Sequence, residues 1–145
     1  MGDTLNNEQV IENSLAVDAS CIGNPGPMEY QAVHVASLQP IFHFGPIHGT
    51  NNIGEFLAIV HALALIQQKG WGDNMPVYSD SLTAIQWVKQ KRCRTKLKRD
   101  EHTESLFQII NRAEDWLRTH TYTNPVLKWQ THLWGDIPAD FARKI

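Results

Sequence analysis

The 145-residue sequence has little cysteine and no long apolar run. Its two cysteines, Cys21 and Cys93, form neither a CxxC pair nor a zinc-binding spacing, so a reduced thiol in the cytoplasm is the expectation. No apolar stretch reaches about 18 residues, which excludes a membrane-spanning helix. The polar, acidic N-terminal residues lack the basic and apolar regions of a secretory signal, so no signal peptide is expected.

Several catalytic and phosphate-binding motifs are also missing. The sequence contains no GxxxxGK[ST] or GxGxxG phosphate loop and no GxSxG nucleophile motif. None of its seven histidines belongs to an HExxH or another paired metal spacing. What remains is ordinary globular composition, 42% hydrophobic and 19% charged, in a chain long enough for one domain with its own core.

The net charge of −2 counts, as an average, against a nucleic-acid-binding protein. The charges are unevenly distributed, however, because no acid lies between Asp80 and Asp100. Such a one-sign cluster is commonly a solvated loop, but it also attracts polyanions whatever the net charge. Seven of the thirteen basic residues fall within this stretch: Lys89, Lys91, Arg92, Arg94, Lys96, Lys98 and Arg99.

Hydrophobic periodicity predicts an α/β domain. Strands are expected over 14–20, 30–36, 41–47, 75–79 and 125–130, and helices over 52–69, 81–89, 104–118 and 137–144. The first three strands follow short turns and should be antiparallel, and the later ones should join by crossovers. The result is a five-stranded mixed sheet flanked by helices. Residues 1–13 are predicted to be a flexible tail before a single domain over 14–145.

Four acids occupy positions where a carboxylate is awkward. Asp18 lies within an apolar strand, Glu55 in the first turn of the most apolar helix, Asp80 directly after a strand, and Asp140 between Ala139 and Phe141. Helix capping could explain Glu55 and Asp80, and exposure on an amphipathic helix could explain Asp140. No such explanation suits Asp18. Burying lone carboxylates costs several kcal/mol, so a compensating charge is expected.

Oxygen ligands of this kind suit Mg²⁺ or Mn²⁺ rather than zinc. Because ligands in open α/β sheets bind at the carboxyl ends of the strands, Asp80 and the start of the helix carrying Glu55 could converge there. Two such ions about 3.5–4 Å apart can activate a water and stabilise a departing oxygen in phosphodiester hydrolysis.

The motifs LAVDASCIGNPGP, TNNIGEFLAIVHAL, VYSDSLTAIQWV and LKWQTHLWGDIPADFARK resemble those of type 1 ribonuclease H, in its compact bacterial form. The resemblance covers about residues 14–144. It implies a ribonuclease H-like fold, a cytoplasmic monomer, and hydrolysis of the RNA strand of RNA–DNA hybrids with two Mg²⁺ ions, for which Mn²⁺ could substitute. It also implies that the metal ligands are Asp18, Glu55, Asp80 and Asp140.

The resemblance further implies a set of nucleic-acid contacts. Some of these residues would contact the minor groove, and others would bind a phosphate of the DNA strand. Trp87 would pack on a sugar of the DNA strand. A wide, A-form-like minor groove presents 2′-hydroxyls to small polar side chains, which suits the asparagines. The candidate contacts are Asn24, Thr50, Asn51, Asn52, Trp87, Thr95, Lys96 and Thr131.

The chain departs from the family pattern at several positions. Leu82 replaces a usual glutamine, so one minor-groove contact is expected to be lost, and Lys96 follows Thr95 where a second hydroxyl is common. His132 resembles a histidine that assists water activation or product release in other branches, and Asp136 stands where close relatives have glutamate. Both are secondary catalytic candidates, with a surface loop as the alternative for His132.

The sequence thus predicts a Mg²⁺-dependent ribonuclease H. Three alternatives remain open at this point: a nuclease or resolvase of the same fold that acts on duplex DNA, a catalytically silent hybrid-binding module, and a mixed α/β domain whose acids are helix caps.

Overall fold

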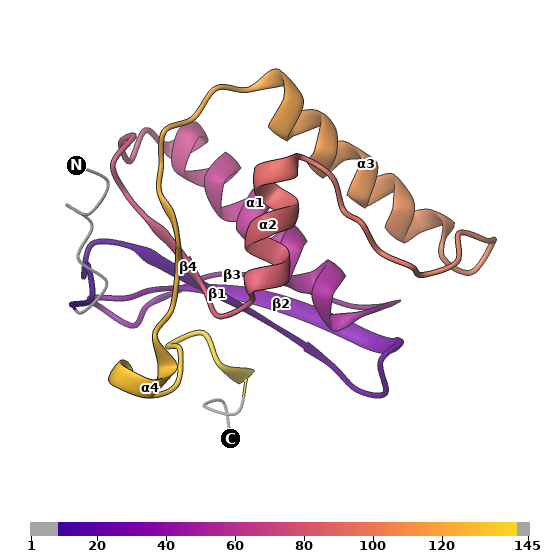
Figure 1. The fold of residues 1–145 in the computed structure, drawn as a ribbon, viewed down its shortest axis with the longest axis horizontal. Helices are drawn as coiled ribbons and strands as arrows, with labels where there is room; N and C mark the ends of the chain where they lie inside the picture. The colour runs from indigo at the N-terminus through magenta and orange to yellow at the C-terminus, as the bar shows by residue number, and fades with distance from the viewer. Residues whose placement is uncertain (1–8, 142–145) are drawn as a thin grey trace.

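A computed structural model describes residues 9–141 and contains one five-stranded sheet, in the order β3-β2-β1-β4-β5 (Figure 1). Strands β1 (Leu15–Cys21), β2 (Gly26–His34) and β3 (Pro40–Gly49) form an antiparallel meander. The short strands β4 (Val77–Ser79) and β5 (Val126–Lys128) continue the sheet in parallel with β1. This is the predicted mixed sheet.

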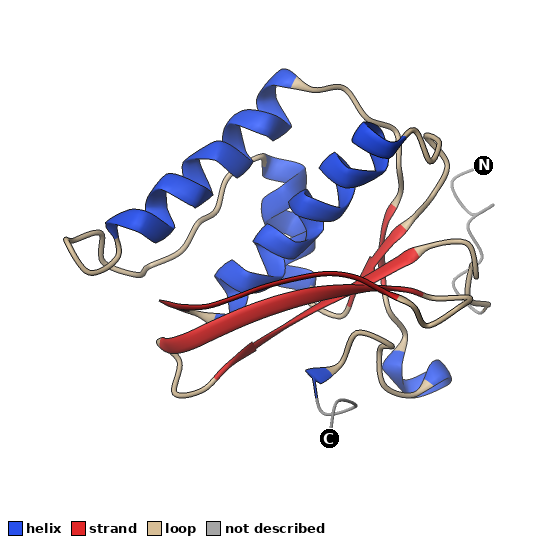
Figure 2. Cartoon of the chain, turned by 180° about the vertical axis from the view of Figure 1, so that it is seen from behind, coloured by secondary structure: helices blue, strands red, loops and turns tan. Residues whose placement is uncertain are grey.

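Three helices cover one face of this sheet: α1 (Asn51–Lys69), α2 (Leu82–Gln90) and α3 (Glu104–Thr119) (Figure 2). The short helix α4 (Thr131–Trp134) lies on the other side. Helix α1 begins where the Thr50 hydroxyl accepts a hydrogen bond from the Ile53 amide, and it ends at Gly70, whose φ of 66° favours glycine. None of the helices in the described part of the chain is long and apolar enough to cross a membrane.

Helix α1 packs unusually close to the sheet because Gly54 has no side chain. A Cβ at this position would lie 2.8 Å from both the Ala19 Cβ and the Met28 Sδ. The main hydrophobic core forms between α1 and the sheet around fully buried residues such as Phe56 and Ile59. The N-terminal part of α1, and Glu55 with it, is thereby held against β1 and β2.

A second apolar cluster covers the opposite face of the sheet. It is built on Ala16, Val33, Tyr78, Trp129, Ile137 and Ala139. Val10 and Ile11 pack against it, and the Ile11 amide donates a hydrogen bond of 3.0 Å to the Tyr78 hydroxyl. Of the segment predicted to be a flexible tail, residues 9–13 are described and contribute these contacts; the domain boundary at residue 14 stays a prediction.

Element boundaries differ most clearly from the prediction at β2 and at the last predicted helix. Strand β2 begins at Gly26, four residues before the predicted start at residue 30. Its antiparallel pairing with β1 begins at Met28 and its pairing with β3 begins at Gly26, so the strand is longer than the alternating pattern indicates. The helix predicted over 137–144 is wrong for residues 137–140, which form a turn closed by a 2.9 Å hydrogen bond from the Asp140 amide to the Ile137 carbonyl, whereas Phe141 is in a 3₁₀ conformation. Residues 142–144 lie outside the described residues.

Candidate active site

Three of the four predicted carboxylates come together. Asp18 projects from β1, Glu55 from the start of α1, and Asp80 from the junction between β4 and α2. One oxygen atom from each lies within 4.8 Å of the others. Strands β1 and β4 are parallel neighbours, so their carboxyl ends bring Asp18 and Asp80 to the same region, as open α/β sheets do for ligands.

Capping explains neither Glu55 nor Asp80. At the start of α1 the cap is Thr50, and the first turn of that helix contains no acid. At the start of α2 the cap is Ser81, whose hydroxyl accepts a 3.0 Å hydrogen bond from the Ala84 amide. Asp80 precedes that cap and follows Ser79, whose hydroxyl accepts from the Ser81 amide at 3.1 Å. The serines on both sides satisfy the helix start and leave the Asp80 carboxylate available.

Burial makes this carboxylate group electrostatically unfavourable on its own. Asp18 is 8% exposed and Glu55 is 3% exposed. Desolvation is the largest cause of the raised pKa of Asp18, and the charge of Asp80 is the second. The pKa of Glu55 is raised further, mainly by desolvation and then by the charges of Asp18 and Asp80. The Glu55 Oε1 atom is buried without a hydrogen-bond partner in the described structure. Such an atom calls for a cation or a proton.

Asp80 is less buried than the other two. Desolvation raises its pKa, the charge of Lys128 opposes that rise, and the charge of Asp140 adds to it. Lys128 ends β5, where it is the register partner of Ser79 in the parallel β4–β5 pair. Sequence reasoning missed this cation. No sequence signal reveals it, because its nearness to Asp80 depends on the register between β4 and β5.

Asp140 lies beside the three-carboxylate group without belonging to it. Its negative charge raises the pKa of both Asp18 and Asp80, so it is close enough to act on them. The turn over residues 137–140, rather than a helix, places it there.

The donor set fits a hard divalent cation. All three clustered residues, and Asp140 next to them, offer carboxylate oxygens as ligands. A cation bound there would compensate the negative charge at the buried Glu55 Oε1 atom, which has no hydrogen-bond partner in the described structure. Without a cation, two carboxylates buried this close are accommodated by a proton held on at least one of them.

The predicted minor-groove residues lie at the rim of this site. The Asn24 Oδ1 atom accepts a 2.9 Å hydrogen bond from the Asn51 amide and thereby joins the β1–β2 turn to the start of α1. Asn52 follows on the first turn of α1 and is exposed. Thr50 caps the same helix, so its hydroxyl oxygen is already an acceptor while its proton can still be donated.

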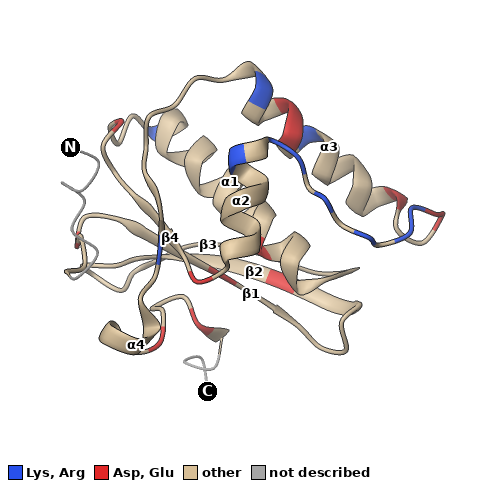
Figure 3. Ribbon diagram, viewed as in Figure 1, with Lys and Arg blue, Asp and Glu red and all other residues tan. Residues whose placement is uncertain are grey.

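The predicted DNA-strand contacts lie on α2 and on the segment after it. Trp87 is partly buried and packs edge-on against Phe56, with ring centroids 6.2 Å apart. The Thr95 hydroxyl accepts from the Leu97 amide at 3.1 Å, and Lys96 is exposed. Figure 3 shows Lys and Arg following one another along the segment that joins α2 to α3.

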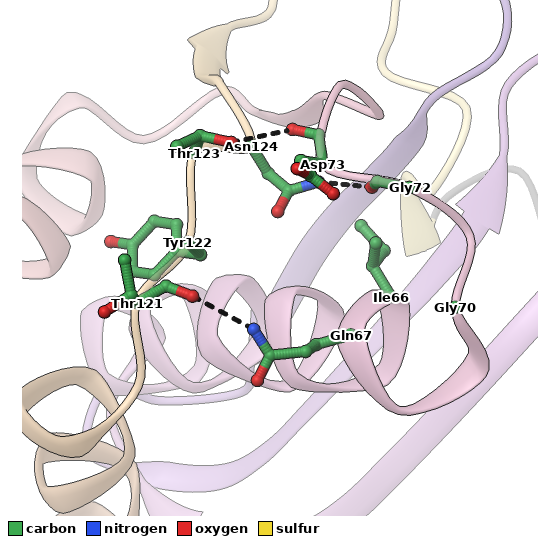
Figure 4. Close-up of a pocket in the computed structure, with 9 residues that line it drawn as sticks. All are labelled: Ile66, Gln67, Gly70, Gly72, Asp73, Thr121, Tyr122, Thr123 and Asn124. Carbon is green, nitrogen blue, oxygen red and sulfur yellow. Dashed lines mark hydrogen bonds between the residues drawn. The ribbon is translucent and has the colours of Figure 1, made fainter.

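The remaining candidates lie on the loop before Asp140. Thr131, His132 and Asp136 are exposed, the first two on α4, and the structure does not bring them into the three-carboxylate group. A cavity of about 340 Å³ at the other end of α1, drawn in Figure 4, contains none of the predicted site residues.

The mixed sheet and its buried carboxylate group define an α/β domain with a candidate divalent-cation site. The model of the RNase H family matches residues 12–131, and the chain belongs to that family. The family assignment makes it a hydrolytic ribonuclease, which confirms the prediction from the sequence motifs.

The chain is similar to several individual proteins. Ribonuclease H of Neorickettsia sennetsu is 29% identical over 119 residues, covering 75% of this chain and 71% of that protein. The structure of LC11-RNase H1, isolated from compost by a metagenomic approach, has a TM-score of 0.51 at 17% identity, covering 80% of this chain and 84% of the other. RNase H1 of Halobacterium salinarum NRC-1 has a TM-score of 0.48 at 22% identity, covering 79% and 81%. The compost enzyme shares the fold.

Proposed function

We propose that this chain hydrolyses the RNA strand of RNA–DNA hybrids with two divalent cations. The observation that carries the proposal is the group of three carboxylates, two of them buried, with an unpartnered Glu55 oxygen, in a chain of the RNase H family. Asp18, Glu55 and Asp80, together with Asp140, would hold Mg²⁺, or Mn²⁺ in its place. When bound, such ions supply an activated water and stabilise the oxygen that leaves the phosphorus.

The chain's own residues would position the RNA strand at these carboxylates. Asn24 and Asn51 form a linked rim beside Glu55, with amide groups suited to the edges and 2′-hydroxyls of a wide minor groove. Asn52 adds a further exposed amide. The charge of Lys128 lowers the pKa of Asp80, and the same charge would attract the phosphate that is to be cleaved.

The DNA strand would lie across α2 and the basic segment that follows it. Trp87 would pack on a deoxyribose, and Thr50, Thr95 and Lys96 would hold a phosphate of that strand. Requiring 2′-hydroxyls on one strand and deoxyribose on the other selects hybrids over either pure duplex. Most of the basic side chains between 91 and 99 are exposed, so they can neutralise phosphates without losing buried contacts.

The loop before Asp140 is proposed to act later in the reaction. His132 is exposed on α4 and is assigned a role in water activation or product release, with Asp136 beside it and Thr131 as a backbone contact. We also propose that the protein works as a monomer in the cytoplasm; sedimentation of the purified protein tests the first part.

The proposal is tested with labelled RNA–DNA hybrid, RNA duplex and DNA duplex, each incubated with and without Mg²⁺. Cleavage confined to the RNA of the hybrid, and only with metal, is the expected result. Cleavage of DNA duplex but not hybrid would instead favour a nuclease or resolvase of the same fold. Hybrid binding without cleavage would favour a silent binding module, and indifference to chelation would leave the acids as structural residues.

A further inference from the structure

We infer that Gln31 is a positioning residue, which links β2, the strand paired with that of Asp18, to the turn of Asp140 and sets the direction of the Asp140 side chain. This inference rests on the proposed function, because it assigns Asp140 to the metal site. The observation behind it is a buried hydrogen bond: the Gln31 Nε2 atom donates to the Ala139 carbonyl at 2.6 Å.

The sheet register places Gln31 directly opposite Asp18 in the antiparallel β1–β2 pair. Directly opposed residues share a face of the sheet, with their Cβ atoms about 4.5–5.5 Å apart. Gln31 therefore projects from the same face as the metal-ligand candidate on β1. Its amide reaches from there to the turn on the other side of the site, 108 positions later in the sequence.

The contact fixes a single peptide group. The carbonyl of Ala139 accepts from Gln31, while the amide of Asp140, in the same peptide unit, donates to the Ile137 carbonyl at 2.9 Å. Because a peptide unit is planar, holding both of its polar groups fixes its orientation. That orientation in turn limits where the Cβ of Asp140 points.

The surroundings prevent solvent from replacing this bond. Gln31 is 6% exposed, Ala139 is fully buried and Ile137 is 2% exposed. If the glutamine amide were removed, the Ala139 carbonyl would lose its donor in a buried setting, which is unfavourable. Rotation of the peptide toward another donor would relieve this cost and would move Asp140.

Gln31→Leu removes the donor with little change in side-chain size. Gln67→Leu is the matched control: the Gln67 Nε2 atom donates to the Thr121 carbonyl at 3.0 Å, a bond of the same kind shown in Figure 4. Gln67 lies twelve residues after Glu55 on α1, about 18 Å along the helix. It therefore tests the loss of a glutamine-to-backbone bond away from the carboxylates.

For Gln31→Leu we expect the affinity for Mg²⁺, measured by calorimetry on the substrate-free protein, to fall about 10-fold. Amide exchange in the peptide spanning 135–141 should accelerate, and the kcat on hybrid should fall about 10- to 100-fold with little change in KM. Gln67→Leu should match the wild type in all three. A second variant, Gln31→Met, keeps a side chain of similar length without any donor, and should show the same losses.

Unchanged Mg²⁺ affinity and unchanged exchange over 135–141 in a folded Gln31→Leu protein would overturn the inference. Equal losses in Gln67→Leu would also overturn it, since they would reduce the effect to general stability. If Gln31→Leu does not fold, the same measurements on Gln31→Met decide. Failure of the proposed function can be distinguished from failure of the inference about Gln31, because in the first case the wild type itself would not cleave hybrid with Mg²⁺.

Discussion

Replacing Asp18 by asparagine should stabilise the metal-free protein at high pH. In the folded chain the pKa of Asp18 is raised from 3.8 to about 7, first by burial and then by the charge of Asp80. At 1.36 kcal/mol per pKa unit, the ionised carboxylate at pH 8 costs the folded state about 4 kcal/mol relative to a neutral group. Asparagine is neutral and of similar shape, so Asp18→Asn should raise the free energy of unfolding at pH 8 by about 2–4 kcal/mol. Any amide group that the asparagine leaves without a hydrogen bond reduces this gain.

The sign of the pH dependence follows from the direction of the shift. Because the pKa of Asp18 is higher in the folded than in the unfolded state, the folded state binds this proton more tightly. The stability contributed by the protonated Asp18 carboxyl is therefore fully present below about pH 4. It is lost as the pH rises through about 7. The stability difference between Asp18→Asn and the wild type should therefore be largest at pH 8 and nearly vanish at pH 4.

Urea unfolding in EDTA at pH 8, 6 and 4 measures this difference. Added Mg²⁺ should act in the opposite sense, stabilising the wild type by about 2.7 kcal/mol at a hundred times its dissociation constant and the variant by less. The reasoning is refuted if Asp18→Asn is the less stable protein at pH 8 in EDTA, or if the difference does not depend on pH.

Three further predictions concern other parts of the site. Asp80→Asn should abolish cleavage but retain hybrid binding in a filter or anisotropy assay, because the phosphate contacts lie elsewhere; full activity would contradict the assignment. Gly54→Ala should destabilise the fold by about 1–3 kcal/mol in thermal or urea unfolding, since its Cβ would meet Ala19 and Met28 at 2.8 Å, whereas an unchanged midpoint would show that α1 can shift at no cost. Lys96→Ala should weaken hybrid binding and reduce its salt dependence by up to about one unit of slope; an unaltered slope would remove Lys96 from the interface.

Local signals were sufficient to predict most of the fold. The limits of α1 follow from Thr50 and Gly70, which cap it, and the change from strand to helical periodicity marks the end of the meander. The short helix α4 was missed because four residues carry no detectable period. The helix predicted after it was wrong for residues 137–140, since Pro138 and the apolar spacing there suit a buried turn as well as a helix.

The clustering of carboxylates could be predicted, but their partners could not. A buried acid in a strand and an acid at a strand end are visible in sequence, and adjacent parallel strands bring Asp18 and Asp80 together. Lys128 and Gln31 depend instead on register between strands that are distant in sequence. No periodicity reveals which side chain will face which, so contacts of this kind require the three-dimensional structure.

Cleavage of a labelled RNA–DNA hybrid by Glu55→Gln, in single turnover over a range of Mg²⁺ concentrations, tests the central claim most directly. Glu55 is the most buried of the three carboxylates and its Oε1 atom has no partner in the described structure, so the ionised form of Glu55 requires a compensating cation. A folded Glu55→Gln protein should cleave at least about 1,000-fold more slowly than the wild type, a loss of about 4 kcal/mol in transition-state stabilisation. Wild-type cleavage with the same Mg²⁺ dependence would show that these carboxylates do not form the metal site.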